Sequence, residues 1–364
     1  MVMGKVRVFN TIDQIDKESI NSIADDGFFT YGWFKTLETT KIFNVELFYL
    51  VVYDEDRIVA IAPCIIDSYD KYFSLIGKHA FLGNMLHLTN KLRLFSNRLL
   101  VCYSPDSCHS KILLGNHSGE KRISKLICDK IADICKKERI SISLFFYVSE
   151  LDRLLMGNLP SLGYHKVYLK DTLNLDIKWS NFDEYLESLP YDKRKDAKRE
   201  IRKFSSSGVT ISEENEFGNL STEISNLYSK LHAKHNNGAA TPYNPLFFKS
   251  LSQYAKEKAR VFVAKKSNKI LGFVLFLQQA NVLDAYICGF DYEAFTKTDF
   301  WYFNLVYYEP IRLAINERIR KIHYRAGDYS TLKAKYRRGC KPERNYSFVR
   351  VHNRLLANLI RLLL

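Results

Sequence analysis

The cysteines of this 364-residue chain lack the pattern of a disulfide framework or of a zinc site. There are seven, an odd number, and no two of them stand in a CxxC arrangement. We therefore predict reduced thiols and no bound metal. The chain also lacks an uninterrupted apolar stretch of membrane-spanning length, and its first residues, MVMGKVRVFNTIDQID, lack the apolar run of a signal peptide. These absences favour a soluble, cytoplasmic protein.

The segment 353–364, NRLLANLIRLLL, is the one part of the sequence that suggests a membrane surface. Its leucines could make a peripheral membrane contact. Packing against the body of the protein or against a second subunit is the use we favour. The sequence leaves the oligomeric state open.

Acidic residues are scarce relative to basic ones. The 54 lysines and arginines exceed the 40 aspartates and glutamates, which gives a formal charge of +14. Hydrophobic residues make up 46% of the chain and aromatic residues 14%, so the shortage of acids does not reflect disorder. A folded protein this basic is expected to attract RNA, nucleotide cofactors or an anionic membrane surface. General solubility is the alternative explanation, although it needs far less charge.

The hydrophobic pattern predicts an α+β (α/β) fold in two tandem domains, 1–175 and 176–364. Each half holds a hairpin, 45–66 and 259–278, followed by a strand, a helix and further strands. The two hairpins match in spacing and polarity, which indicates a duplicated fold. This order of elements is similar to that of N-acetyltransferase (GNAT) domains. We expect each domain to be a mixed, largely antiparallel sheet flanked by helices.

Between the halves, residues 192–207 (DKRKDAKREIRKFSSS) predict a basic helix. Ala197, Ile201 and Phe204 form a narrow apolar stripe on it. With Asp192 set aside at the start of the helix, the other faces carry seven cations against Asp196 and Glu200, a local excess of five that a solvated helix would pair better. The cations are Lys193, Arg194, Lys195, Lys198, Arg199, Arg202 and Lys203. We predict an anion-binding surface here, for RNA or for the phosphates of a donor.

A second basic segment, 326–342 (AGDYSTLKAKYRRGCKP), is the predicted centre of the chemistry. It follows a strand expected at 321–325, and Asp328 is its only acid. Its cations are Lys333, Lys335, Arg337, Arg338 and Lys341. Such a density of unpaired charge predicts a bound phosphate or a developing oxyanion, and a solvated basic loop is the alternative.

Several motifs resemble those of the Fem-like acyltransferases of the GNAT superfamily, including the peptidoglycan biosynthesis or recognition group. They run from the basic helix through Thr241-Pro242-Tyr243, Gly272, Tyr286, Gly289 and Tyr307-Tyr308 to Gly327, Lys335 and Arg338-Gly339. The resemblance spans roughly residues 175–351. The residues after Pro63 depart from that group, and Asn304 stands where it usually has Glu, which leaves the acceptor open.

The resemblance implies transfer of an acyl or aminoacyl group to an amine, and it suggests roles for individual residues. Lys335 matches the C-terminal lysine of the family best and is assigned to the oxyanion or the donor phosphate, with Lys333 as the alternative. Arg337, Arg338 and Gly339 would clamp phosphate, although a structural salt bridge is the alternative for either arginine.

The candidate general bases are Asp328, Glu309, His232 and His235. Glu309 precedes Pro310 in an expected helix, a position that can mark a functional bend. The two histidines have metal-like spacing but no third ligand in view. The residues assigned to a substrate pocket are Tyr243, Tyr286, Asn304, Tyr307, Tyr308 and His235, with core packing as the default for each tyrosine.

The donor is inferred from a missing motif. Acetyl-CoA enzymes of this fold cradle pyrophosphate in a glycine-rich loop of the form [QR]xxGx[GA]. Neither half contains it, and residues 115–119 match it only weakly. We therefore predict aminoacyl-tRNA as the co-substrate, no tightly bound cofactor, and a cell-wall precursor or a peptide-like natural product as the amine acceptor. The alternatives are an acyl-CoA-dependent N-acyltransferase and a noncatalytic RNA- or envelope-binding protein.

Overall fold

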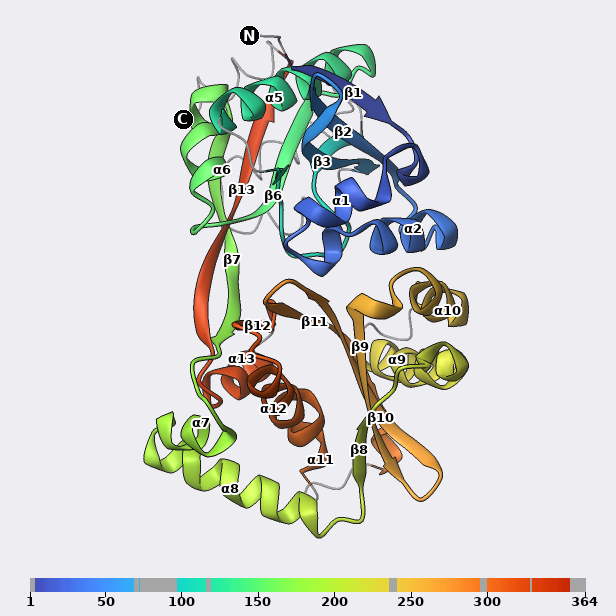
Figure 1. Ribbon diagram of the computed structural model, residues 1–364, viewed down its shortest axis with the longest axis vertical. Helices are drawn as coiled ribbons and strands as arrows, with labels where there is room; N and C mark the ends of the chain where they lie inside the picture. The colour runs from blue at the N-terminus through green and yellow to red at the C-terminus, as the bar shows by residue number, and fades with distance from the viewer. Residues whose placement is uncertain are drawn as a thin grey trace. The chain divides into compact units, whose positions relative to one another are not determined.

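The computed structural model describes residues 4–68, 72, 97–115, 119–235, 241–294, 300–327 and 329–353 (Figure 1). They divide into two compact units. Unit 1 comprises residues 1–23, 44–171 and 343–364, and unit 2 comprises 24–43 and 172–342. A single boundary at residue 175 would place 24–43 in the N-terminal domain and 343–364 in the C-terminal domain. The structure instead groups 24–43 with unit 2 and 343–364 with unit 1. The leucine-rich tail after residue 353 lies outside the described residues.

Unit 1 is built on a mixed sheet in the order β1-β2-β3-β4-β6-β13. All neighbours in it are antiparallel except β4 and β6, which are parallel. Helices α5 and α6 pack on one face, where Ile127, Ile131 and Leu155 are fully buried. The elements are β1 (Lys5–Phe9), α1 (Lys17–Ile23), β2 (Glu46–Asp54), β3 (Arg57–Ser68), β4 (Arg98–Cys102), β5 (Leu113–Leu114), α5 (Glu120–Lys137), β6 (Ile142–Ser149), α6 (Arg153–Asn158), β7 (His165–Asp176) and β13 (Lys341–Val351).

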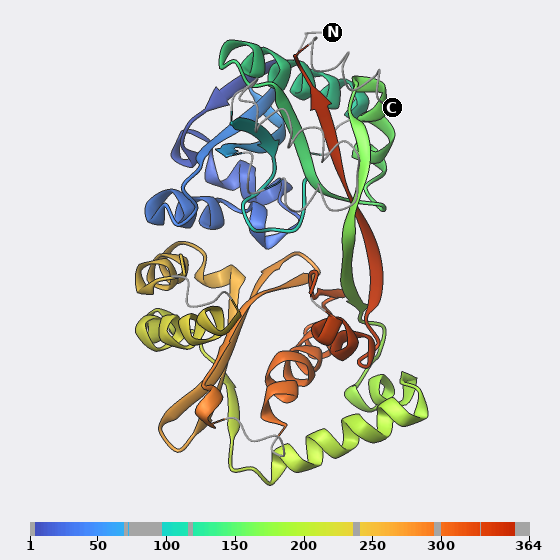
Figure 2. The same ribbon diagram turned by 180° about the vertical axis from the view of Figure 1, so that it is seen from behind.

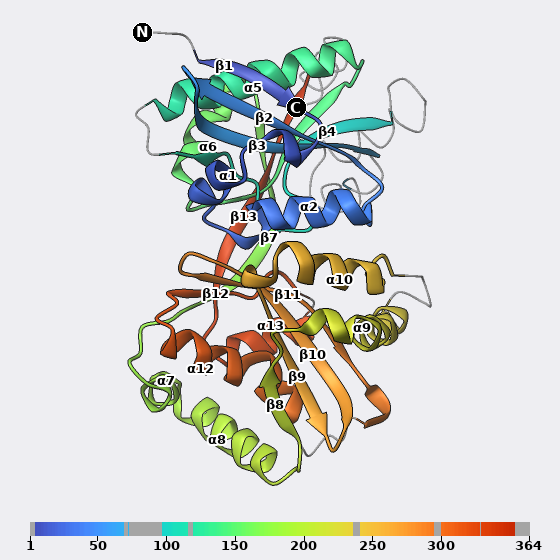
Figure 3. The same ribbon diagram turned by 45° about the vertical axis from the view of Figure 1, so that its right-hand side comes forward.

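Unit 2 repeats this sheet in the order β8-β9-β10-β11-β12-β7, again with one parallel pair, β11 and β12. Figure 3 shows α9 and α10 on one side of β9 and β10, and α12 and α13 on the other. Its elements are α2 (Tyr31–Thr40), α7 (Phe182–Ser188), α8 (Tyr191–Ser205), β8 (Thr210–Glu213), α9 (Ser221–His235), α10 (Pro245–Tyr254), β9 (Ala259–Lys266), β10 (Lys269–Gln279), β11 (Val282–Phe290), α11 (Trp301–Phe303), a π-helical stretch η7 (Asn304–Tyr308), α12 (Glu309–Asn316), β12 (Lys321–His323) and α13 (Tyr329–Tyr336). The duplication predicted from the two hairpins is thus confirmed.

In each unit the strand that completes the sheet comes from the other half of the sequence. Strand β13 follows α13 along the chain, yet its residues 345–351 pair with β6 of unit 1 (Figures 1 and 2). Strand β7 follows α6, and its last residues pair with β12 of unit 2. This exchange explains why residues 343–364 group with unit 1.

The sequence predicts one continuous helix over 300–318, and the structure interrupts it. Pro310 has no N–H group to donate to a carbonyl one turn earlier, so the regular ladder cannot continue through it. The turn before it is π-helical, with the N–H of Glu309 donating to the carbonyl of Asn304. All five residues of η7 are buried. The irregular turn therefore directs Asn304, Tyr307 and Tyr308 into the core of unit 2.

All seven cysteines are free thiols. Among the helices in the described part of the chain, none combines the length and the apolar character that crossing a membrane requires.

Candidate functional site

The segment 326–342, expected to be an open basic loop or an anion site, contains a helix, α13, followed by a turn at residues 337–339. Lys335 lies on the inner side of α13 and is only 7% exposed. Its Nζ donates hydrogen bonds to the carbonyls of Tyr324 (2.7 Å), Ala326 (3.0 Å) and Arg325 (3.2 Å). Lys335 therefore ties α13 to the chain that leaves β12, and its charge is held in the interior of unit 2.

Gly327 permits this close approach. A Cβ atom at this position would lie 2.1 Å from Oγ1 of Thr331 and 3.3 Å from Nζ of Lys335. The first separation is impossible unless the Thr331 side chain or the backbone moves. Near the same ammonium group, burial raises the pKa of the Cys288 and Cys340 thiols to about 12, and the charge of Lys335 offsets part of that rise.

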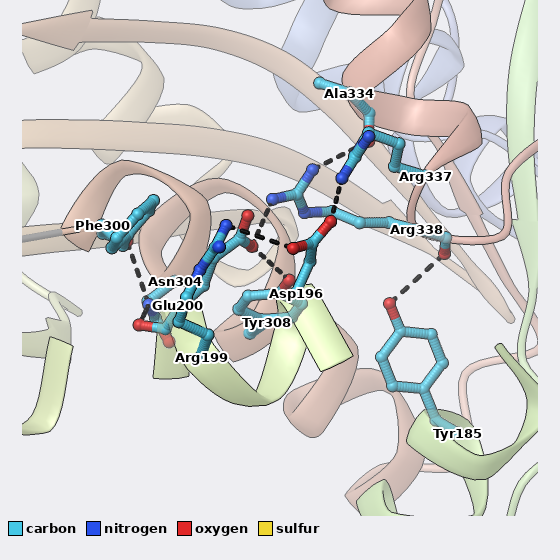
Figure 4. A network of polar contacts seen from close by, with 10 residues as sticks. All are labelled: Tyr185, Asp196, Arg199, Glu200, Phe300, Asn304, Tyr308, Ala334, Arg337 and Arg338. Carbon is cyan, nitrogen blue, oxygen red and sulfur yellow. Dashed lines mark hydrogen bonds and ion pairs between the residues drawn. The ribbon is translucent and has the colours of Figure 1, made fainter. Parts of the chain in front are cut away.

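Arg338 is buried in a network that joins α8, η7 and α13 (Figure 4). Its guanidinium donates to Oε2 of Glu200 at 2.6 Å and to the carbonyl of Ala334 at 2.9 Å. The same Glu200 oxygen accepts a hydrogen bond from the Tyr308 hydroxyl at 2.5 Å. The ring of Phe303 lies 3.9 Å from the guanidinium carbon. With 4% of its side chain exposed, Arg338 has the contacts of a structural ion pair, the alternative to a phosphate clamp.

Arg337, the neighbouring residue, forms an ion pair with Asp196 of α8. Asp196 also contacts Arg199 at 3.1 Å. Both of these inward-facing acids of α8, Asp196 and Glu200, are therefore engaged by consecutive arginines after α13. From the sequence, the two acids are expected only to balance part of the charge of the helix. Their position in the sequence indicates this inward orientation, because both lie beside the apolar stripe of the helix and thus on its inner side.

With these two acids turned inward, the outer face of α8 is left basic. Lys195, Lys198, Arg199, Arg202 and Lys203 are all exposed. Lys193 and Arg194 are partly buried, and Arg194 donates to the carbonyl of Glu187 at 3.2 Å. The donor-binding residues assigned on α8 thus separate into exposed cations and cations near the core.

The predicted pocket residues divide between two aromatic clusters of unit 2. Asn304, Tyr307 and Tyr308 belong to the cluster around Arg338, and burial raises the pKa values of both tyrosines. Tyr243 and Tyr286 belong to a second cluster with Phe28, Trp33 and Phe247, in which the Tyr286 hydroxyl donates to that of Tyr243 at 2.9 Å. All the described tyrosines of the set are buried.

The remaining candidates are less constrained. Glu309 lies 3.6 Å from Arg312, and burial raises the pKa of its carboxyl group. Lys333 is exposed on α13. The ring of His232 lies beside that of Tyr228. Asp328 and the side chain of His235 lie outside the described residues.

A second polar cluster, in unit 1, was not anticipated from the sequence. Oγ of Ser143 lies 2.8 Å from Nε2 of His352 and 3.0 Å from the hydroxyl of Tyr164. A serine next to a histidine can act as a nucleophile and its base. Ser143, however, is fully buried, so the contact completes a structural network.

We expect this network to make the stability of the protein depend on pH. Burial, reinforced by Arg350, lowers the pKa of His352 to about 4, against 6.5 for an ordinary histidine. The unfolded chain therefore binds the proton more readily, and stability present above pH 6.5 should be lost as the pH falls towards 4. Because the ring is partly exposed, we expect a loss of about 2 kcal/mol. Urea unfolding of His352→Gln should show a smaller loss over this range, whereas replacing the exposed His165 should leave it unchanged.

A family model described as FemAB-like, peptidoglycan biosynthesis/recognition, matches residues 11–364. The solved structure of FemX is 13% identical, with 97% of this chain and 99% of FemX covered and a TM-score of 0.63. The C-terminal domain of a putative lysylphosphatidylglycerol synthetase from Agrobacterium fabrum is 11% identical, with 96% and 93% covered and a TM-score of 0.54. No curated protein matches the chain.

A tandem GNAT protein from the clavulanic acid biosynthesis pathway is also similar. It is 9% identical, with 96% of this chain and 99% of that protein covered, at a TM-score of 0.51. Identities this low bear on the fold alone. The structural similarities confirm the prediction of two tandem GNAT-like domains.

Proposed function

Because the chain belongs to the FemAB-like family of peptidoglycan biosynthesis/recognition proteins, we propose that it moves an aminoacyl group from aminoacyl-tRNA to the amine of a cell-wall precursor. The family and the tandem GNAT fold indicate an acyltransferase-type enzyme of peptidoglycan biosynthesis. The donor and the acceptor amine are the proposed part.

The choice of donor rests on the positive charge of the outer face of α8. Its inward acids are engaged by Arg337, Arg338 and Arg199, so four exposed cations remain for a partner: Lys195, Lys198, Arg202 and Lys203. A row of cations along a helix suits a repeated phosphate backbone better than the compact diphosphate of coenzyme A. This supports a tRNA donor over acyl-CoA.

In the proposed reaction, the acceptor amine attacks the ester carbonyl of the aminoacyl-tRNA. The carbonyl oxygen becomes negative, the new C–N bond forms, and the terminal ribose hydroxyl leaves with a proton that the amine has lost. We assign stabilisation of the oxyanion to Lys335, whose ammonium would exchange one of its three backbone carbonyl acceptors for the oxyanion, with the exposed Lys333 as the alternative. Of the two candidate bases among the described residues, Glu309 and His232, we favour Glu309, because burial raises the pKa of its carboxyl group and so makes it a stronger base.

The donor can be identified by binding and transfer. We expect charged tRNA to bind at micromolar concentrations, to bind more weakly as salt increases, and to support amide formation with a cell-wall precursor. Reversing two outer charges, Lys198→Glu with Arg202→Glu, should weaken tRNA binding at least tenfold while the unfolding midpoint stays unchanged, since both side chains are exposed.

Three outcomes would contradict this proposal. Saturable binding of acyl-CoA with turnover, and none with charged tRNA, would identify an acyl-CoA-dependent N-acyltransferase. Equal binding of charged and uncharged tRNA without transfer to any amine would identify a noncatalytic RNA-binding protein. Transfer from charged tRNA to a peptide-like natural product, with none to cell-wall precursors, would overturn the proposed acceptor alone.

A further inference from the structure

Tyr191, the first residue of α8, is an unusually exposed aromatic residue. Its exposed fraction is 73%, the largest for any large hydrophobic side chain in the described part of the chain. Buried tyrosines are accounted for by packing, as in the two aromatic clusters of unit 2. A single exposed ring is ordinary on a protein surface. This ring is of interest because it lies at the start of the basic helix α8.

The position of Tyr191 aligns it with the outer cations of α8. Tyr191, Lys195, Lys198 and Arg202 are spaced i, i+4, i+7 and i+11, which places them on one face of a helix. All four side chains are exposed. Over eleven residues the stripe extends about 16 Å along the helix axis. We call these four residues the α8 stripe.

A second exposed ring, that of Tyr336, belongs to the neighbour in sequence of a residue that contacts α8. Tyr336, 49% exposed, precedes Arg337, whose guanidinium pairs with Asp196 of α8. It follows the exposed Lys333 on α13 by three residues, one helical turn. Exposed tyrosines thus occur beside exposed cations on both segments that the Arg337–Asp196 ion pair joins.

The residue types on α8 favour single-stranded nucleic acid over a membrane surface as the partner. A helix that lies on a membrane presents a broad apolar face, whereas Tyr191 is the only exposed aromatic or aliphatic residue of α8. An aromatic ring among cations is the pattern that proteins use for single-stranded nucleic acid: the ring stacks on an unpaired base, and the cations contact phosphates. Duplex RNA offers no free base face to such a ring.

We propose that the α8 stripe binds single-stranded RNA, with Tyr191 stacking on an unpaired base and Lys195, Lys198 and Arg202 contacting successive phosphates. This inference rests on the proposed tRNA donor, and it names the unpaired end of that tRNA as the part that α8 meets.

The test measures the contributions of the Tyr191 ring and of the cations to RNA binding separately. Binding of a fluorescent single-stranded RNA oligonucleotide, and of the same sequence as a duplex, is measured over a range of salt concentrations. Tyr191→Ala should weaken single-strand binding about tenfold without changing its salt dependence, and Tyr191→Trp should preserve it. Arg202→Ala should instead lower the slope of log K against log salt by about 1. Tyr168→Ala, which removes an exposed tyrosine from unit 1, is the matched control and should change neither quantity.

The outcomes separate this inference from the proposed function. Unchanged single-strand affinity in Tyr191→Ala, or an equal loss for single strand and duplex, would overturn the stacking while leaving the tRNA donor in place. Failure of the wild-type protein to bind any RNA would overturn the donor as well. Binding of anionic phospholipid vesicles in preference to RNA would identify α8 as a membrane contact. Every variant replaces an exposed side chain, so a circular dichroism melt should show each one folded.

Discussion

Replacing Glu200 with alanine should destabilise the protein by about 3–5 kcal/mol, because it leaves the Arg338 guanidinium buried without its carboxylate. The Tyr308 hydroxyl loses its acceptor in the same variant. Arg338→Ala should cost a similar amount for the converse reason. The free energy of unfolding in urea, measured for both variants, tests this expectation.

Asp196→Ala is the matched control. Asp196 lies one turn before Glu200 on the same helix and also pairs with an arginine, but 25% of its side chain and 36% of the Arg337 side chain are exposed. Its loss should therefore cost about 1 kcal/mol or less. The double variant Glu200→Leu with Arg338→Met should be less destabilised than either Glu200→Ala or Arg338→Ala, because it leaves no unpaired charge. Equal costs for Asp196→Ala and Glu200→Ala would show that burial does not set the strength of this network.

Replacing Lys335 with alanine should lower the rate of amide formation at least a hundredfold, since an oxyanion donor contributes about 3 kcal/mol to transition-state stabilisation. The loss should appear in kcat, because the oxyanion exists only in the transition state. The structure adds a second expectation. The three carbonyls that Lys335 bonds would lose a donor, at about 1–3 kcal/mol for each one left buried and unsatisfied, so the protein should also be less stable.

Gly327→Ala separates the two effects. It disturbs the contact between the chain after β12 and α13 through the clash with Thr331 but keeps the ammonium group. If Lys335 acts on the oxyanion, Lys335→Ala should lose far more activity than Gly327→Ala at temperatures where both are folded. Matching losses of activity would mean that Lys335 only positions the chain after β12.

The fold could be predicted from the sequence where the local pattern decides it. The hairpins 45–66 and 259–278 and the helix 119–137 carry strong periodicity, and the structure places β2–β3, β9–β10 and α5 there. The short strand β8 and the terminal strand β13 were not predicted. Strand β13 pairs with β6 roughly 200 residues earlier, and no local pattern specifies such a partner.

The candidate site could be predicted as a set of residues but not as an arrangement. The sequence identified Lys335, Arg337 and Arg338 as a cluster of cations. It could not distinguish the exposed cations of α8 from the buried Arg338, because this depends on which acids turn inward. Asp196 and Glu200 made the basic helix look partly neutralised, whereas in the fold they serve as anchors.

The exchange of terminal strands has a consequence for synthesis. Chains usually fold from the N-terminal domain onward as they leave the ribosome. Here the first 175 residues contain neither complete unit, because unit 1 requires β13 and unit 2 requires everything up to residue 342. The edge of β6 must stay unpaired while nearly 200 further residues are made, and such an edge can pair with other chains. A nascent chain of this protein therefore depends on protection of that edge until β13 arrives.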